Sequence, residues 1–141
     1  MKLTALLVAL FCACGFASAA EQGKTITKPD GLKIQQNYVP PGCTHMRRSK
    51  SGDQMTMQYT GKLTNGKVFD SSRNPGRQAF QFTLGVGQVI KGWDEGLLGV
   101  CVGEKLTLTI PASIGYGARG YPPVIPGGAT LIFSVEVVNI G

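Results

Sequence analysis

Hydrophobic and polar residues alternate along several short segments of the chain. Between residues 53 and 60, Met55, Met57 and Tyr59 fall on one side of the backbone and polar residues fall on the other. This period of two is typical of a strand that buries one face. Segments with the same alternation, or with a weaker form of it, predict further strands at residues 32–39, 67–69, 80–84, 105–110 and 130–140.

One segment, residues 85–97, has a helical spacing instead. Ile90, Trp93 and Leu97 lie at i, i+3 and i+7 and therefore share one face of a helix. Glycines surround these residues, and each interior glycine destabilises a helix by about 0.5–1 kcal/mol relative to alanine. The helix therefore needs a sheet folded over its apolar face. The sequence predicts an α+β domain in which a twisted sheet of five or six antiparallel strands wraps around one short helix, with Trp93 as the floor of a cavity.

Two connections interrupt this pattern. Residues 71–79 are turn-forming and are expected to break the return strand of a hairpin whose turn is Asn65-Gly66. Residues 112–129 form a long connection, rich in glycine and proline, around Tyr116 and Tyr121. A connection of this length inside a compact domain usually has a functional role.

The first residues resemble a targeting segment. An apolar run over residues 6–16 is followed by Ala17-Ser18-Ala19, the small-x-small pattern that precedes signal-peptide cleavage. We therefore expect a signal peptide at residues 1–19, a flexible tail at 20–30 and one folded domain at 31–141. No later segment is apolar over enough residues to predict a membrane span.

The charge balance excludes one class of partner. The chain carries 14 basic and 8 acidic side chains, a net charge of +6. Its densest basic run is Arg47-Arg48-Ser49-Lys50, which is short and has no row of aromatic residues beside it. Nucleic-acid binding is therefore not expected.

Two of the four cysteines, Cys12 and Cys14, fall in the predicted signal peptide. Cys43 and Cys101 remain, and in an oxidising compartment such a pair favours a disulfide, although two buried free thiols are the alternative. Cys43 lies near His45, the only histidine, so there are too few ligands for a metal site. Neither a metal nor a cofactor is expected.

The residues with the most chemical interest are aromatic. A sheet wrapped around the helix would bring several rings together, either as an ordinary core or as the wall of a ligand pocket. Asp70 is the unusual member, because a carboxylate beside an aromatic cavity needs hydrogen-bonding partners. The chain has no phosphate-binding glycine loop and no nucleophile elbow. The converging rings are Tyr59, Phe69, Phe80, Trp93, Tyr116 and Phe133.

The sequence resembles the FKBP-type peptidyl-prolyl isomerases. The similarity rests on motifs that follow one another in the same order along the chain, so that coincidence is a poor explanation. The matching motifs are residues 59–61 (YTG), 66–73 (GKVFDSSR), 80–85 (FQFTLG), 88–97 (QVIKGWDEGL), 103–105 (GEK), 110–111 (IP), 115–117 (GYG) and 125–133 (IPGGATLIF).

The resemblance implies a substrate pocket with Trp93 as its floor. Asp70 and Tyr116 match the polar pocket residues, so these three are the expected catalytic residues, and the Tyr116 hydroxyl would bind a ligand carbonyl. Tyr121 would contact the ligand from its loop. The implied substrate-binding walls are Tyr59, Phe69, Phe80, Val89, Ile90, Val124, Ile125 and Phe133.

The resemblance also implies an activity that needs no nucleophile. An X-Pro amide moved into a water-poor aromatic cavity loses the solvation that favours its planar form, so rotation becomes easier. Expected ligands are proline-containing polypeptides and macrolide immunosuppressants, and the protein is expected to be a monomer. The alternative is a non-catalytic module that only binds proline-containing segments.

Two features of the sequence bear on which subgroup of the family the chain resembles and on where the protein is located. Cys43 and Cys101 match the disulfide positions of the small secretory-pathway members, whereas residues 138–141 carry no retention signal. We therefore expect a protein of the endoplasmic-reticulum lumen or a secreted one. The loop at residues 74–79 is longer than in the smallest family members, which leaves open whether Arg77 reaches Asp70.

Overall fold

The structure is a computed structural model that describes residues 23–141. The predicted signal peptide, residues 1–19, lies outside the described residues. Along the chain the elements are β1 (Thr25–Thr27), β2 (Lys33–Tyr38), the 3-10 turn η1 (Cys43–His45), β3 (Gln54–Leu63), β4 (Val68–Ser71), β5 (Phe80–Thr83), α1 (Lys91–Gly96), β6 (Lys105–Ile110), the 3-10 turn η2 (Ala112–Ile114) and β7 (Leu131–Ile140).

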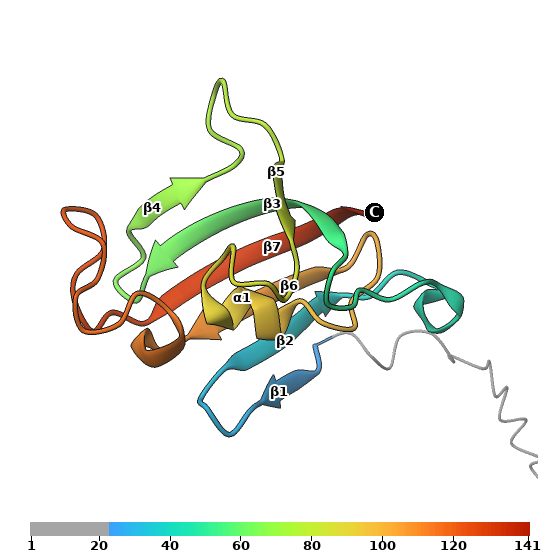
Figure 1. The fold of residues 1–141 in the computed structure, drawn as a ribbon, viewed down its shortest axis with the longest axis horizontal. Helices are drawn as coiled ribbons and strands as arrows, with labels where there is room; N and C mark the ends of the chain where they lie inside the picture. The colour runs from blue at the N-terminus through green and yellow to red at the C-terminus, as the bar shows by residue number, and fades with distance from the viewer. Residues whose placement is uncertain (1–22) are drawn as a thin grey trace, which may run out of the picture.

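The strands form one antiparallel sheet in the order β1-β2-β6-β7-β3-β4, and β5 also pairs with β3. Figure 1 shows this curved sheet with α1 lying across one of its faces. On β3, β6 and β7 the buried positions alternate with more exposed ones, as the period of two predicted. The α+β class with a sheet around one short helix is confirmed.

The sheet contains one strand more than the sequence predicted. Thr25 pairs with Gln35 and Thr27 with Lys33, so part of the predicted tail at residues 20–30 is an ordered edge strand. All three residues of β1 are exposed. Because no side of this strand is buried, the amino-acid pattern carried no signal for it, and the folded unit begins before residue 31.

One edge of the sheet is interrupted. β5 pairs with the first part of β3, where Met57 faces Phe80, and β4 pairs with its last part, where Thr60 faces Ser71. The chain between β4 and β5 leaves the sheet as a loop, residues 72–79. This agrees with the predicted break in the return strand, and it places the end of β4 next to the middle of β3.

The glycines of α1 allow the helix backbone to lie against the sheet. A Cβ atom on Gly92 would be 2.6 Å from Ile110 Cγ2, and one on Gly96 would be 3.0 Å from Leu108 Cδ2. Trp93, between them, is buried with 4% of its surface exposed. The two glycines lower the helix propensity of this segment, but they permit its close packing against the sheet. A side chain at either position would prevent that packing.

The helix is shorter than the segment that predicted it, since Ile90 and Leu97 only flank it. The preceding residues form a turn that the Asp94 carboxylate binds, with Oδ1 accepting from the Gly85 amide at 2.8 Å and Oδ2 accepting from the Gly87 amide at 3.0 Å. These two hydrogen bonds tie the turn to α1. They therefore fix the position of the residues between the turn and the helix.

Cys43 and Cys101 form a disulfide with their Cα atoms 6.0 Å apart, which confirms the predicted pair. The bond joins η1 to the connection between α1 and β6. Among residues 23–141, no helix combines the length and the apolar character needed to cross a membrane.

Candidate active site

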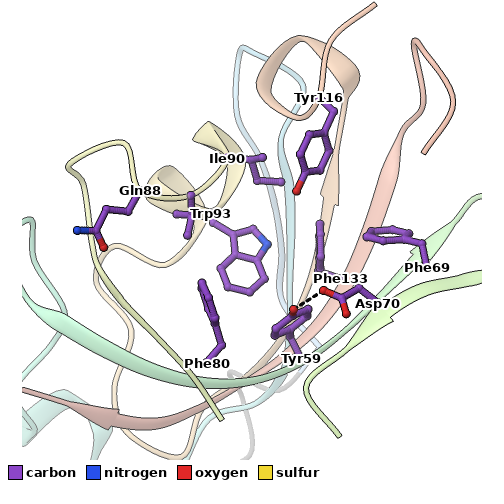
Figure 2. Close-up of a pocket in the computed structure, with 10 residues that line it drawn as sticks. Tyr59, Phe69, Asp70, Phe80, Gln88, Ile90, Trp93, Tyr116 and Phe133 are labelled. Carbon is purple, nitrogen blue, oxygen red and sulfur yellow. Dashed lines mark hydrogen bonds between the residues drawn. The ribbon is translucent and has the colours of Figure 1, made fainter. Parts of the chain in front are cut away.

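A cavity of about 380 Å³ opens beside α1, between the interrupted edge of the sheet and the chain that follows η2. Figure 2 shows its aromatic side chains arranged around Trp93, with Asp70 and the hydroxyls of Tyr59 and Tyr116 on one side of the indole and Gln88 on the other. Most of its lining residues are ones that the sequence predicted. They are Tyr59, Phe69, Asp70, Phe80, Gln88, Val89, Ile90, Trp93, Tyr116 and Phe133.

The indole of Trp93 is held by the rings around it. Its centroid lies 5.1 Å from that of Tyr59 at an interplanar angle of 82°, and 5.2 Å from that of Phe133 at 85°. Phe80 is 6.1 Å away at 79°. These edge-to-face contacts are favourable aromatic geometries. They support the indole from its sides and fix the floor of the cavity.

The indole nitrogen of Trp93 is a buried donor. Within residues 23–141, Nε1 is the one buried side-chain nitrogen or oxygen that has no hydrogen-bond partner. Figure 2 shows it on the side of the ring that faces Tyr116 and Phe133. A buried polar group without a partner is costly and uncommon in folded proteins, so this donor marks the floor as an unusual environment.

Phe69 and Phe133 form the wall near β4 and β7. Their centroids are 5.5 Å apart at an angle of 90°. Gly61 on β3 makes room for this pair, because a Cβ atom there would lie 2.5 Å from Phe69 Cζ and 2.8 Å from Phe133 Cε1. Any other residue at position 61 would therefore clash with both rings of this wall.

Asp70 forms the polar side of the cavity. Its carboxylate accepts hydrogen bonds from the hydroxyl of Tyr59, from Arg77 Nη1 at 3.1 Å and from the Ser71 amide at 2.9 Å. Arg77 Nη2 also donates to the Tyr59 hydroxyl, at 3.4 Å. Arg77 therefore reaches Asp70 across the longer loop, which settles the question that the sequence left open.

The same contacts determine the protonation of Tyr59. Burial, together with the hydrogen bond to Asp70 and its charge, raises the pKa of the Tyr59 hydroxyl to about 12. The pKa of the Arg77 guanidinium is also raised, by the charge of Asp70 first. At neutral pH, Tyr59 is therefore a neutral donor to Asp70, and Arg77 remains a cation.

Tyr116 follows η2 and faces the cavity from the side opposite Phe80. Its side chain is partly exposed, and Figure 2 shows its hydroxyl pointing into the cavity. Burial, followed by the charge of Asp70, raises the pKa of this hydroxyl, so it stays protonated at neutral pH. It is therefore a donor available to a ligand.

Three of the predicted pocket residues do not line the cavity. Tyr121 and Val124 are 62% and 43% exposed, and Ile125 belongs to the hydrophobic core. Tyr121 instead packs against Tyr116, with ring centroids 5.8 Å apart. Because Tyr121 and Ile125 pair with each other through their backbones, the loop turns Tyr121 and Val124 outward.

Gln88 lines the cavity but was not predicted as a site residue. Its Oε1 accepts a hydrogen bond from the Thr83 amide at 2.9 Å, which anchors the side chain to the end of β5. The one signal for Gln88 was its place in the family motif, directly before Val89. Its polar side chain and its position in an exposed turn gave no further reason to expect it at an aromatic cavity.

The cavity itself offers Asp70 as its carboxylate, already bonded to three donors. Elsewhere in residues 23–141, Cys43, Cys101 and Glu104 are the one group whose ligand atoms are close enough for a metal. Both sulfur atoms of that group belong to the disulfide. The described residues therefore do not assemble a metal site.

Comparison with known proteins agrees with this geometry. The profile of the family described as FKBP-type peptidyl-prolyl cis-trans isomerase matches residues 45–138. The peptidyl-prolyl cis-trans isomerase FKBP2 of Bos taurus is 61% identical over 117 residues, 82% of this chain and 83% of that protein. The FK506-binding protein 2 of Dictyostelium discoideum is 48% identical over 141 residues, 99% of each chain.

A solved structure shows the same architecture. The crystal structure of AtFKBP13 superposes with a TM-score of 0.74 at 35% identity, covering 84% of this chain and 99% of the other. The similarity in sequence thus extends to the fold that builds the cavity. Since the family profile covers more than half of the chain and the relatives align over most of their length, this chain belongs to the FKBP-type peptidyl-prolyl cis-trans isomerases.

Proposed function

We propose that an X-Pro peptide bond binds in this cavity with the proline ring on Trp93 and rotates there between its cis and trans forms. Rotation about a peptide bond has a barrier of about 18–20 kcal/mol, because the twisted amide loses its resonance. The planar form carries more charge on its oxygen and is therefore better solvated by water. An aromatic cavity removes part of that solvation and favours the twisted form.

The polar residues assist without making or breaking a covalent bond. The Tyr116 hydroxyl donates a hydrogen bond to a carbonyl oxygen of the substrate beside the proline. Asp70 is bonded to Tyr59 and Arg77, so it orients its neighbours and provides a fixed charge. It has no role in this scheme as a base.

The observation that carries this proposal is the construction of the cavity floor. Trp93 is 4% exposed and yet lines a cavity of about 380 Å³, so nearly all of the indole surface packs against the protein and the remainder faces the space for a ligand. The aromatic walls give this space the low polarity that the mechanism requires.

The proposal predicts how two cavity variants behave in a protease-coupled assay with a proline-containing tetrapeptide. Tyr116→Phe removes one hydrogen bond and should lower kcat/KM by about three- to tenfold. Trp93→Leu keeps an apolar side chain but removes the floor, and should lower it by at least about tenfold. Tyr38→Phe, on β2 and outside the cavity lining, is the matched control and should keep full activity.

The same assay separates the two functions that the sequence left open. A wild-type protein that binds the peptide and does not accelerate isomerisation would be a binding module. Full activity in Trp93→Leu would show that the reaction occurs elsewhere.

Further parts of the proposal concern ligands and location. The Dictyostelium relative is named an FK506-binding protein, which supports macrolide binding in the same cavity. Inhibition of the tetrapeptide assay by FK506 tests this part of the proposal.

The Cys43–Cys101 disulfide supports an oxidising compartment, either the endoplasmic-reticulum lumen or the cell exterior. We expect a monomer, which sedimentation would test.

A further inference from the structure

Ser72 occupies the gap in the interrupted edge of the sheet. It directly follows β4, and only 2% of its surface is exposed. Met57 is the last residue of β3 that pairs with β5, and Thr60 is the first that pairs with β4. The backbone of Tyr59, between them, would therefore lack the partners that a continuous neighbouring strand provides.

Ser72 supplies both of those partners. Its amide donates to the Tyr59 carbonyl at 2.9 Å, as in an antiparallel ladder. Its hydroxyl oxygen then takes the place of a backbone carbonyl and accepts from the Tyr59 amide at 2.8 Å. The hydroxyl can donate to Gln58 Oε1 at 2.6 Å or to the Tyr59 carbonyl oxygen at 3.3 Å, and the shorter bond to Gln58 orients the oxygen toward the Tyr59 amide. The loop can leave the sheet here because a side chain completes the ladder.

Tyr59 is thus held at both ends. Ser72 binds its backbone, and Asp70 accepts from its hydroxyl at the cavity. Its ring, between these contacts, lies 5.1 Å from Trp93. A shift of the backbone at Tyr59 would therefore move both the polar side of the cavity and a ring that supports its floor.

We infer that Ser72 is a positioning residue for the isomerase reaction, which acts through Tyr59 without touching the substrate. This inference rests on the proposed function, since it assumes that substrate binds on Trp93 beside Tyr59. Ser72 lies outside the cavity lining, so any effect of its hydroxyl on turnover must pass through another residue.

The test is a double-variant cycle on kcat/KM, measured with a proline-containing tetrapeptide in the protease-coupled assay. Ser72→Ala alone should lower kcat/KM by about three- to tenfold, because a small misplacement at a site is enough to slow a reaction. Tyr59→Phe alone should also lower it. In the double variant the loss should be clearly smaller than the product of the two single losses, because both changes affect the same group. Losses that multiply would overturn the inference, as would full activity in Ser72→Ala.

Ser49 provides a matched control for the loss of a buried hydroxyl. It is 5% exposed, its oxygen accepts from the Val100 amide at 2.9 Å, and it donates to the Leu97 carbonyl at 2.5 Å. Ser49→Ala should lower the melting temperature as Ser72→Ala does, yet keep kcat/KM within about twofold of wild type. An equal loss of activity in both variants would show that reduced stability alone explains the effect of Ser72→Ala.

If Ser72→Ala does not fold, Gln58→Ala tests the same link, because it removes the nearer of the two acceptors of the Ser72 hydroxyl and leaves that hydroxyl in place. It should cause a smaller loss of kcat/KM that also becomes weaker in the Tyr59→Phe background; a loss that persists unchanged there would refute the inference. Failure of the proposed function would look different. In that case Trp93→Leu and Tyr59→Phe would both keep full activity.

Discussion

At the scale of single residues, the contacts of Asp70 define what its carboxylate can do. It accepts from a tyrosine hydroxyl, a guanidinium and a backbone amide. The hydrogen bonds to these three donors commit the carboxylate oxygens to contacts within the protein. Its role is to hold Tyr59 and Arg77 in place.

We therefore predict that Asp70→Asn lowers kcat/KM by less than about tenfold, whereas loss of a true general base costs about 10²–10⁴-fold. The asparagine oxygen can still accept from Tyr59, whereas the ion pair with Arg77 and the hydrogen bond from the Ser71 amide, both made by Oδ1, are lost. Arg77→Met should have an effect of similar size in the same peptide assay. Complete inactivity of Asp70→Asn with an unchanged circular dichroism spectrum would contradict this role.

The raised pKa of Tyr59 predicts a pH dependence of stability. The hydroxyl has a pKa of about 12 in the folded chain and an ordinary value of 10.0, so the unfolded chain loses this proton first. The free energy of unfolding should therefore keep its full Tyr59 contribution below about pH 10 and lose it as the pH rises toward 12.

Urea unfolding of wild type and Tyr59→Phe across this range isolates the contribution of Tyr59. The difference between the two proteins should shrink with rising pH, because only wild type has this hydroxyl to ionise. A difference that stays constant from pH 9 to pH 12 would exclude the predicted linkage.

At the scale of elements, α1 shows two opposing effects of glycine. Replacing Gly92 by alanine improves helix propensity by about 1 kcal/mol. The new methyl group, however, would lie 2.6 Å from Ile110 Cγ2. Because this contact is on the buried face of the sheet, the repulsion should outweigh the gain in propensity.

We expect Gly92→Ala to lower the free energy of unfolding by about 1–3 kcal/mol through overpacking. Gly96→Ala should cost less, because its nearest contact, Leu108 Cδ2, is at 3.0 Å and ends a flexible side chain. Chemical denaturation of the two variants measures both values. If Gly92→Ala is more stable than wild type, helix propensity and not packing controls this element.

At the scale of the whole molecule, the disulfide and the cavity are separate features of the fold. The Cys43–Cys101 bond links positions 58 residues apart in sequence. Neither cysteine lines the cavity. The bond should therefore affect stability more than activity.

Replacing both cysteines by alanine should lower the free energy of unfolding by about 2–4 kcal/mol, since the unfolded chain regains its freedom. At temperatures where the variant stays folded, kcat/KM should remain within about twofold of wild type. A thiol titration of native wild type should find neither Cys43 nor Cys101 reactive; two reactive thiols would disprove the bond.

The sequence alone was enough to predict the strands with one buried face, the short helix on Trp93 and the disulfide pair. These features depend on the local periodicity of hydrophobic residues, on motifs and on the number of cysteines. All of these can be identified without coordinates. The burial of Tyr59 and Phe133 followed from the alternation along their strands, whereas only the resemblance to the family implied that these rings line a substrate pocket.

Only the tertiary structure decided the remaining features. β1 has no buried face and exists because β2 offers its edge. The paths of two loops determine whether Arg77 reaches Asp70 and whether Val124 faces the cavity. Ser72 binds Tyr59 across 13 positions of sequence, because the break between β4 and β5 leaves that backbone without a strand. Contacts of this kind are set by the register and distance between separate segments, which a one-dimensional pattern does not contain.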